Sequence, residues 1–317
     1  MKKNNIKRVV MGVLAVVLVF ASVLASGLSN VENVSAFGVS PPNKSVVLNP
    51  GDTYRDTVTV VNTDVGGSED FYYKIVVKPF DMNGNDNVYN SSSDRNMIVD
   101  WIKILGDETG VVPYGETKEV EYIVNVPDDA PVGGQYAAIT VTADDEASGD
   151  NGDSVGIKEN MAIAYLLYAE IAGETVRQGE IESASVPSFI LSGDIKGTSA
   201  VKNTGNVHGK AYYTLKVFPL FSGEELYTNE EDPAHMTILP DRTYYNELAW
   251  QETPAMGVFN VVYKVDFEGV TTEVSKIVIK CPVWLLFIIL FIVAALIIWI
   301  VMRIRSKKKG SRRTAGD

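Results

Sequence analysis

Apolar and polar residues alternate along most of the chain between residues 37 and 280. An alternation with a period of two places every second side chain on one face, which is typical of half-buried β-strands. β-branched and aromatic residues fill these runs, and Gly, Pro, Asn and Asp separate them. Because no long amphipathic helical pattern competes here, the sequence predicts an all-β fold. The alternating apolar sets are Val58 and Val60; Tyr73, Ile75 and Val77; Val120, Tyr122, Val124 and Val126; Ala211, Tyr213, Leu215 and Val217; and Phe259, Val261, Tyr263 and Val265.

The two halves of this region repeat one pattern. Asn62 ends an expected strand before a Gly-rich turn, and Asn203 does the same in the second half. Gly and Asn supply the positive φ angles that tight turns need. The repeat predicts a tandem duplication. The alternative is that the two halves share only the turn residues common to β-sandwiches. Either way, we expect two immunoglobulin-like β-sandwiches in series. Further matching pairs are Tyr73 with Tyr213, Pro79 with Pro219, Pro113 with Pro240, and Pro131 with Pro254.

The boundary between the halves follows from composition. Residues 144–157 are acidic and lack a run of apolar side chains to bury, which predicts a linker or loop. The apolar run over residues 161–170 suits a strand buried on both faces or a short helix, and we favour a strand that closes the first sandwich. We therefore expect the first sandwich over residues 37–178, with the acidic segment inside it, and the second over residues 179–280.

Both ends of the chain indicate a membrane protein. Residues 283–302 carry no charge, and seven Lys or Arg residues follow them. An apolar helix of this length spans a bilayer of ~30 Å, and its basic flank stays in the cytoplasm. At the other end, four basic residues precede an apolar run, which predicts a signal peptide over residues 1–36, cut after Ala25 or Ala36. The chain is thus predicted to be a single-pass cell-membrane protein with residues 37–280 outside and residues 303–317 as a cytoplasmic tail.

Charge and cysteine content narrow the classes of partner. Residues 37–280 contain 17 basic and 38 acidic residues, a net charge of −21. Such a surface excludes nucleic acid as a partner, because the phosphate backbone repels it. The only cysteine is Cys281, so no disulfide forms within the chain and the apolar cores alone must stabilise it.

Catalytic chemistry has little support in the sequence. His208 and His235 are the only histidines, and no Gly-x-Ser-x-Gly motif is present, so a nucleophile with a histidine base is not indicated. Neighbouring carboxylates such as Asp128 and Asp129 diverge in an extended backbone. We therefore predict neither a catalytic site nor a cofactor.

A polar loop between residues 81 and 94 is the strongest candidate for ligand binding. Its oxygen donors at alternate positions allow a calcium site. However, an EF-hand loop has Gly at its sixth position and Glu at its twelfth, where this chain has Asp86 and Ser92. A hairpin with an Asn-Gly turn is the favoured interpretation, and no metal is predicted. The predicted ligand-binding residues are Asp81, Asn83, Asn85, Asp86, Asn87 and Tyr89.

The order of several motifs resembles the WxL-interacting protein family of Gram-positive cell surfaces. That resemblance implies a first domain that binds peptidoglycan, a second domain that contacts surface or host proteins, and a WxL-type partner. The matching segments are Phe37-Gly38-Val39-Ser40-Pro41-Pro42, Leu48-Asn49-Pro50-Gly51, Val60-Val61-Asn62, residues 81–89, Val126-Pro127 to Gly133-Gly134, residues 201–208, and Pro282-Val283-Trp284 with the basic tail.

These observations lead to one functional hypothesis and two rivals. We expect a non-enzymatic surface protein that presents two sandwiches to cell-wall glycan, to a surface protein, or to both. Sandwiches bind through their end loops or through strand addition at an edge. An enzyme that acts on wall polymer through carboxylates from distant positions is the first rival. A structural or signalling stalk without a ligand of its own is the second.

Overall fold

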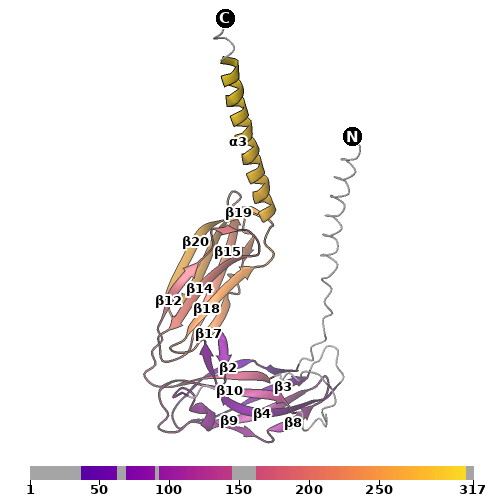
Figure 1. Cartoon of the computed structure of the whole chain (residues 1–317). Coiled ribbons are helices and arrows are strands. Elements are labelled where there is room, and N and C mark those ends of the chain that lie inside the picture. Colours follow the sequence, from indigo (N-terminus) through magenta and orange to yellow (C-terminus); the bar gives the residue numbers. More distant parts are fainter. Residues whose placement is uncertain (1–36, 63–68, 90–92, 145–161, 312–317) are drawn as a thin grey trace.

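The computed structural model describes residues 37–62, 69–89, 93–144 and 162–311. The described chain is mostly β-structure, as the alternation predicts. Figure 1 shows two groups of strands, the first lying across the bottom of the view and the second rising from it, with helix α3 (Val283–Ser311) extending beyond the second group. The predicted signal peptide, most of the acidic segment and the end of the basic tail lie outside the described residues.

The first group forms two sheets, which we call the N-terminal sandwich. A four-stranded sheet has the order β1-β3-β9-β7, and a five-stranded sheet has the order β2-β11-β10-β4-β8. A short helix, α2 (Ile98–Trp101), and the hairpin β5–β6 interrupt the strand sequence between β4 and β7. The strands are β1 (Phe37–Ser40), β2 (Asn43–Leu48), β3 (Thr53–Asn62), β4 (Phe71–Pro79), β5 (Asp81–Asn83), β6 (Asp86–Val88), β7 (Ile102–Leu105), β8 (Thr109–Val112), β9 (Thr117–Asn125), β10 (Gly133–Ala143) and β11 (Ala162–Ile171).

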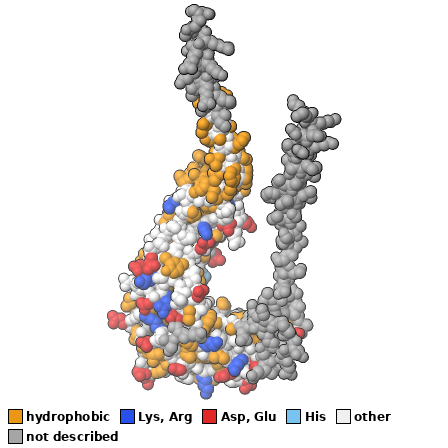
Figure 2. Space-filling view, in the orientation of Figure 1, with side chains coloured by type: hydrophobic (Ala, Val, Ile, Leu, Met, Phe, Trp, Pro, Cys, Tyr) orange, Lys and Arg blue, Asp and Glu red, His pale blue; other side chains and the backbone are white. Residues whose placement is uncertain are grey.

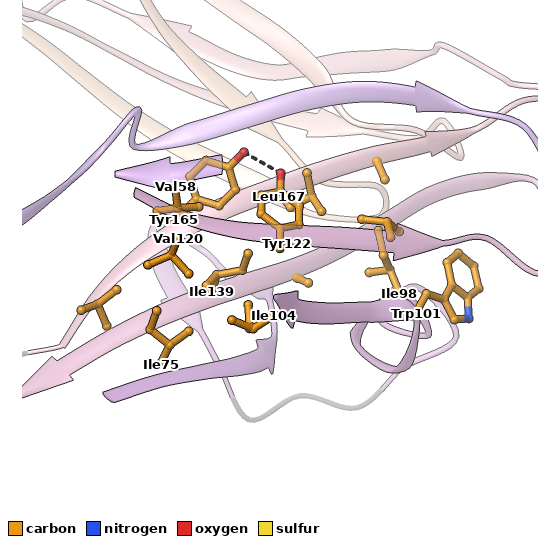
Figure 3. Packing of buried hydrophobic residues seen from close by; sticks show 14 of the residues in the cluster. Val58, Ile75, Ile98, Trp101, Ile104, Val120, Tyr122, Ile139, Tyr165 and Leu167 are labelled. Atoms are coloured by element: carbon orange, nitrogen blue, oxygen red, sulfur yellow. Dashed lines mark hydrogen bonds between the residues drawn. The ribbon is translucent and has the colours of Figure 1, made fainter. Parts of the chain in front are cut away.

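The apolar positions of the alternating runs meet between these two sheets. Val58, Ile75 and Ile139 are among the buried residues of this core (Figure 3). Its polar atoms are satisfied internally, since the hydroxyls of Tyr122 and Tyr165 form a hydrogen bond of 2.9 Å. The apolar run that favoured a strand does form one, because β11 pairs with β10 on one side and in parallel with β2 on the other.

The second group forms the C-terminal sandwich. Its three-stranded sheet has the order β12-β14-β18, and the opposite sheet has the order β13-β20-β19-β15-β16, with β17 also paired to β15. The core between them contains Tyr213 and Tyr263, and the Tyr263 hydroxyl lies 2.8 Å from that of Ser199. The strands are β12 (Gly179–Ser185), β13 (Phe189–Ile190), β14 (Ile195–Asn203), β15 (Gly209–Pro219), β16 (Tyr227–Thr228), β17 (Ala234–Ile238), β18 (Thr243–Trp250), β19 (Gly257–Phe267) and β20 (Val270–Lys280).

The two asparagines matched by the repeat have the same role in their sandwiches. The Asn62 side chain donates to the carbonyls of Glu69 and Val112, at 3.1 and 3.0 Å. The Asn203 side chain donates to the carbonyls of Val207 and Ile238, at 2.8 and 2.9 Å. Each amide therefore supplies donors to carbonyls that the sheets leave unpaired.

The backbone around these asparagines repeats as well. Asn62 accepts a hydrogen bond from the N–H of Gly115, and Asn203 accepts one from the N–H of Asp241. Both donors have a positive φ, 76° for Gly115 and 60° for Asp241. Asp241 is therefore a non-glycine residue in a left-handed conformation, at the position that glycine fills in the first half.

Residues 283–302 are helical, but the predicted membrane span is contradicted. Within the described part of the chain, no helix is both long enough and apolar enough to cross a membrane. Figure 2 shows apolar side chains over the described part of this helix, next to the second group of strands. The localisation predicted from that span, a single-pass cell-membrane protein with its sandwiches outside, is therefore wrong.

Candidate functional site at the junction of the two sandwiches

The polar loop that the sequence singles out is a two-stranded hairpin. β5 and β6 pair from Asp81 opposite Val88 to Asn83 opposite Asp86. Gly84 occupies the first central position of the turn with a φ of 59°, where a type II′ hairpin turn requires glycine. The hairpin interpretation is confirmed, although the turn residues are Gly84 and Asn85 rather than Asn83 and Gly84. Among the described residues, no group of three or more His, Cys, Asp or Glu side chains is arranged to hold a metal ion.

The hairpin contacts the C-terminal sandwich through a bidentate ion pair. Arg242 donates from Nε to Oδ1 of Asp81 at 2.9 Å, and from Nη2 to Oδ2 at 2.6 Å. Asp81 also accepts a hydrogen bond of 2.7 Å from the N–H of Met82. Hydrogen bonding to Asp81 raises the pKa of Arg242 above its ordinary value. A bidentate pair fixes orientation as well as distance, so it holds the hairpin in one position on the second sandwich.

A second arginine joins the sandwiches next to this pair. Arg95 donates from Nη2 to the carboxylate of Asp241 at 2.9 Å, and from Nη1 to the carbonyl of Asn206 at 3.1 Å. The same carbonyl accepts a hydrogen bond of 2.8 Å from the N–H of Gly134. The loop of the C-terminal sandwich that carries Asn206 is therefore bound to two segments of the N-terminal sandwich.

The side-chain amide of Asn85 completes the contact. Its Nδ2 donates to the carbonyl of Tyr245 at 2.6 Å, and its Oδ1 accepts from the N–H of Tyr245 at 2.9 Å. Tyr245 lies on β18, at the edge of the three-stranded sheet. The amide thus takes the place that a residue of a neighbouring strand would have on that edge.

The connecting segment between β11 and β12 is also held in place. Asn206 and Val176 exchange hydrogen bonds, from the N–H of Asn206 to the carbonyl of Val176 at 3.0 Å and from the N–H of Val176 to Oδ1 of Asn206 at 2.7 Å. Arg177 forms an ion pair with Glu170 of β11 and donates to the carbonyl of His208 at 3.3 Å. The two sandwiches are therefore joined by direct contacts and by a connecting segment that is itself hydrogen-bonded to the C-terminal sandwich. Both features favour one angle between the sandwiches.

Aromatic and apolar side chains fill the space beneath these polar contacts. The imidazole of His208 contacts two tyrosine rings, and its centroid lies 5.9 Å from that of Tyr136 and 5.3 Å from that of Tyr168. Burial lowers the pKa of His208 to about 4, and the nearby charges of Arg177 and Lys210 act in the same direction. Among the described residues, Nδ1 of His208 has no hydrogen-bond partner. The buried members of the cluster are Phe80, Met82, Tyr136, Ala138, Tyr168 and Leu239.

A groove of about 540 Å³ opens beside the hairpin, and we call it the junction groove. Both sandwiches contribute to its walls, and the side chain of Tyr245 is 58% exposed there. A smaller hollow of about 200 Å³ adjoins it and shares Asp81, Asp241 and Arg242. The groove is lined by Asp81, Met82, Asn83, Gly84, Val88, Asp241, Arg242, Thr243 and Tyr245.

The predicted ligand-binding residues divide between this groove and the junction itself. Asp81 and Asn83 line the groove, and Asn85 binds the backbone of Tyr245. Asp86 and Asn87 are exposed on β6 and do not line the groove. The Tyr89 ring stacks on Phe80, with 6.1 Å between the ring centroids.

Sequence reasoning missed the residues of the second sandwich that face the hairpin. Arg242 and Tyr245 lie far from Asp81 in the chain, and neither belongs to a recognisable motif. The repeat read from the sequence did not reveal them either. The backbone hydrogen bonds align Gly115 with Asp241 and Glu116 with Arg242, which is one position away from the predicted match of Pro113 with Pro240.

Comparisons with known proteins give only distant structural similarity. No family model matches the chain, and no curated protein matches it. The class 5 fimbriae chaperone CfaA is 16% identical, with 78% of this chain and all of CfaA covered, at a TM-score of 0.35. The chaperone and tip adhesion subunit complex CsuC-CsuE of Acinetobacter baumannii is 14% identical, with 76% and 98% covered, at a TM-score of 0.37. The E. coli chaperone DraB is 13% identical, with 76% and 96% covered, at 0.34.

These findings contradict the predicted membership of the WxL-interacting protein family, which is wrong. No family model matches the chain, so no matching family supports the resemblance. The motifs that suggested it, such as Asn-Gly and Gly-Gly turns, occur in β-sandwiches of many kinds. The peptidoglycan ligand, the WxL-type partner and the cell-surface role that the resemblance implied are withdrawn with it.

Proposed function

We propose that this chain is a non-enzymatic binding protein, in which two immunoglobulin-like sandwiches hold a protein partner at the junction groove. The observation that supports this proposal is the groove itself, because one wall comes from hairpin β5–β6 and the other from β18 and the residues just before it. A site built from two sandwiches depends on the angle between them. Here the ion pairs of Asp81 and Arg95 favour one angle before any partner arrives. Such preorganisation reduces the ordering that binding requires.

The side chains in the groove suit a protein surface. Tyr245 is exposed, and tyrosine is enriched among the residues that dominate the energetics of protein interfaces. Val88 adds apolar surface, while Asn83 offers an amide that both donates and accepts hydrogen bonds. A groove lined by apolar and polar side chains together has the mixed composition of a protein interface.

The rival hypothesis of an enzyme finds less support at this site. Asp81 and Asp241 both line the groove, but each carboxylate is bound to an arginine rather than directed at the other. His208 is buried between tyrosine rings, and His235 lies on β17 near Tyr212. A glycosidase needs two carboxyl groups that act together on one bond, and this pair does not offer that arrangement.

Site-specific crosslinking tests the proposal. A photoreactive amino acid is placed at Asn83 of the full chain in its native cells, with a matched control at Glu119, an exposed residue of β9 that does not line the groove. We expect a discrete protein adduct from position 83, and its loss when Tyr245→Ala is added. No adduct from position 83, the same adducts from both positions, or an adduct that is indifferent to Tyr245→Ala would each overturn the proposal.

A further inference from the structure

Strand β18 is the longest strand at a sheet edge in the described part of the chain. It has eight residues, none of them buried. The other edge of its three-stranded sheet is β12, which lies against β20 and has a bulge between Ile181 and Ser183. Edge strands of the N-terminal sandwich have four to six residues. A long, regular edge is a surface on which another strand pairs readily.

The direction of the backbone groups on β18 follows from two observations. The carbonyl of Arg242 accepts a hydrogen bond from the N–H of Asn203, so the even-numbered residues face β14. Tyr245 presents its N–H and carbonyl to Asn85, on the opposite side. Because these groups alternate along a strand, Glu247 and Ala249 also direct their N–H and carbonyl groups to the open edge. Among the described residues, no strand pairs with that edge.

A hollow lined by both apolar and charged residues lies beside these two residues. It has a volume of about 520 Å³, and Glu247 and Ala249 are among its lining residues. Phe189 and Leu191 also line it, and their side chains are 49% and 43% exposed. Adjacent strands lie ~4.8 Å apart, so an outward side chain of an added strand at Ala249 would reach the rim of this hollow.

We propose that β18 receives an extended segment of a partner polypeptide at residues 247–249, with an apolar side chain of that segment in the adjoining hollow. The inference rests on the proposed function and names the form in which the partner is recognised. Its main support is continuity with the contact between the sandwiches. The amide of Asn85 already occupies one position of this edge, at Tyr245, and the next two outward-facing residues continue the same line. A partner in the junction groove therefore lies next to the free part of the edge.

A second copy of this chain suits the edge less well. If two copies paired in antiparallel fashion about Glu247, the two carboxylates would lie directly opposite each other, and like charges in that arrangement destabilise the pair. Glu247 is already bound to Lys196 of its own chain, at 2.7 Å. A partner segment without acidic residues avoids this repulsion.

A pair of synthetic peptides tests the inference on the full chain. The first is a capped hexapeptide of alternating lysine and valine, and the second carries N-methyl groups on its valines, which removes the donors of one edge. We expect the first peptide to slow amide hydrogen exchange at Glu247 and Ala249, and the second to bind about tenfold more weakly or worse, since several hydrogen bonds are lost.

Two variants of one residue provide the matched control. Ala249→Pro removes an N–H that has no partner within the sheet, so the fold is retained while binding falls by about tenfold or more. Ala249→Ser keeps the N–H, and its affinity should stay within about twofold of the parent. Thermal unfolding of both variants verifies that each is folded.

Three results would overturn the inference. They are equal binding of the two peptides, no protection at Glu247 and Ala249, and a dimer of the parent chain that Ala249→Pro converts to a monomer. The last result would assign the edge to a second copy. Crosslinking from Asn83 is read independently of these peptides. If it succeeds while the peptides fail, the groove remains the binding site and strand addition alone is excluded.

Discussion

Arg242 and Asp81 are separated by 161 positions in the chain, yet the guanidinium of one donates two hydrogen bonds to the carboxylate of the other. Asp81 is buried, whereas the side chain of Arg242 is 39% exposed. The pair joins the only β-hairpin that projects from the N-terminal sandwich, among the described residues, to the start of β18. The shape of the junction groove therefore depends on this contact.

Removal of one partner is expected to be more damaging than removal of both. Arg242→Met leaves the buried carboxylate of Asp81 without its arginine, and we expect a loss of about 2 kcal/mol in the free energy of unfolding. The double variant with Asp81→Asn should recover about 1 kcal/mol of that loss. Urea denaturation of the four proteins of the cycle measures both quantities.

The exposed ion pair of Lys202 with Glu180 supplies the comparison. Its nitrogen and oxygen atoms are 3.8 Å apart, and the side chains of Lys202 and Glu180 are 39% and 57% exposed, whereas Asp81 is buried. Glu180→Gln should change stability by less than about 0.5 kcal/mol. A coupling between Asp81 and Arg242 no larger than this would show that the pair contributes nothing special to the junction.

The elements of the two sandwiches were within reach of sequence reasoning, because local alternation dictates them. Tyr73 and Tyr213 recur at matching positions and are both buried in the cores. The hairpin at Asp81 was also predictable, since Gly84 supplies a positive φ that few other residues adopt.

The site was only half predictable. Asp81 and Asn83 were selected as polar loop residues, but their neighbours Arg242 and Tyr245 reach them only through the angle between the sandwiches. No local pattern encodes that angle. It arises from contacts between distant segments, such as those of Asn206 with Val176 and with the guanidinium of Arg95.

Acid should weaken the protein through His208. Burial lowers the pKa of His208 to about 4 in the folded chain, against about 6.5 for an exposed histidine. The unfolded chain therefore takes up a proton first as the pH falls, and stability is lost between about pH 6.5 and pH 4. The full shift corresponds to a loss on the order of 3 kcal/mol.

A difference measurement isolates this histidine from the carboxylates that also titrate in acid. Denaturation of the parent and of His208→Gln at pH 7, 5.5 and 4.5 should give curves that converge as the pH falls. A constant gap between the two proteins at all three values would rule out a role for His208.

For the buried hydroxyls of Tyr122 and Tyr165, removal of one partner should destabilise the protein more than removal of both. Tyr165→Phe leaves the hydroxyl of Tyr122 without its partner in a site with no exposure, and we expect a loss of about 2 kcal/mol. The double variant Tyr122→Phe with Tyr165→Phe has no orphaned hydroxyl, so it should be closer to the parent than either single variant. Urea denaturation ranks the four proteins, and a double variant that is the least stable would contradict the argument.

Although Asn85 is exposed, its substitution should reduce the stability of the contact at the edge of β18. Asn85→Asp keeps an acceptor for the N–H of Tyr245 but places a carboxylate oxygen near the Tyr245 carbonyl, where the parent has a hydrogen bond of 2.6 Å. We expect a loss of about 1 to 2 kcal/mol and faster amide exchange at Tyr245. Asn87→Asp is the matched control, because it adds the same charge to an exposed residue of the same hairpin and should shift stability by less than about 0.5 kcal/mol. Equal effects of the two substitutions would mean that charge on the hairpin, and not the amide of Asn85, determines how the two sandwiches meet.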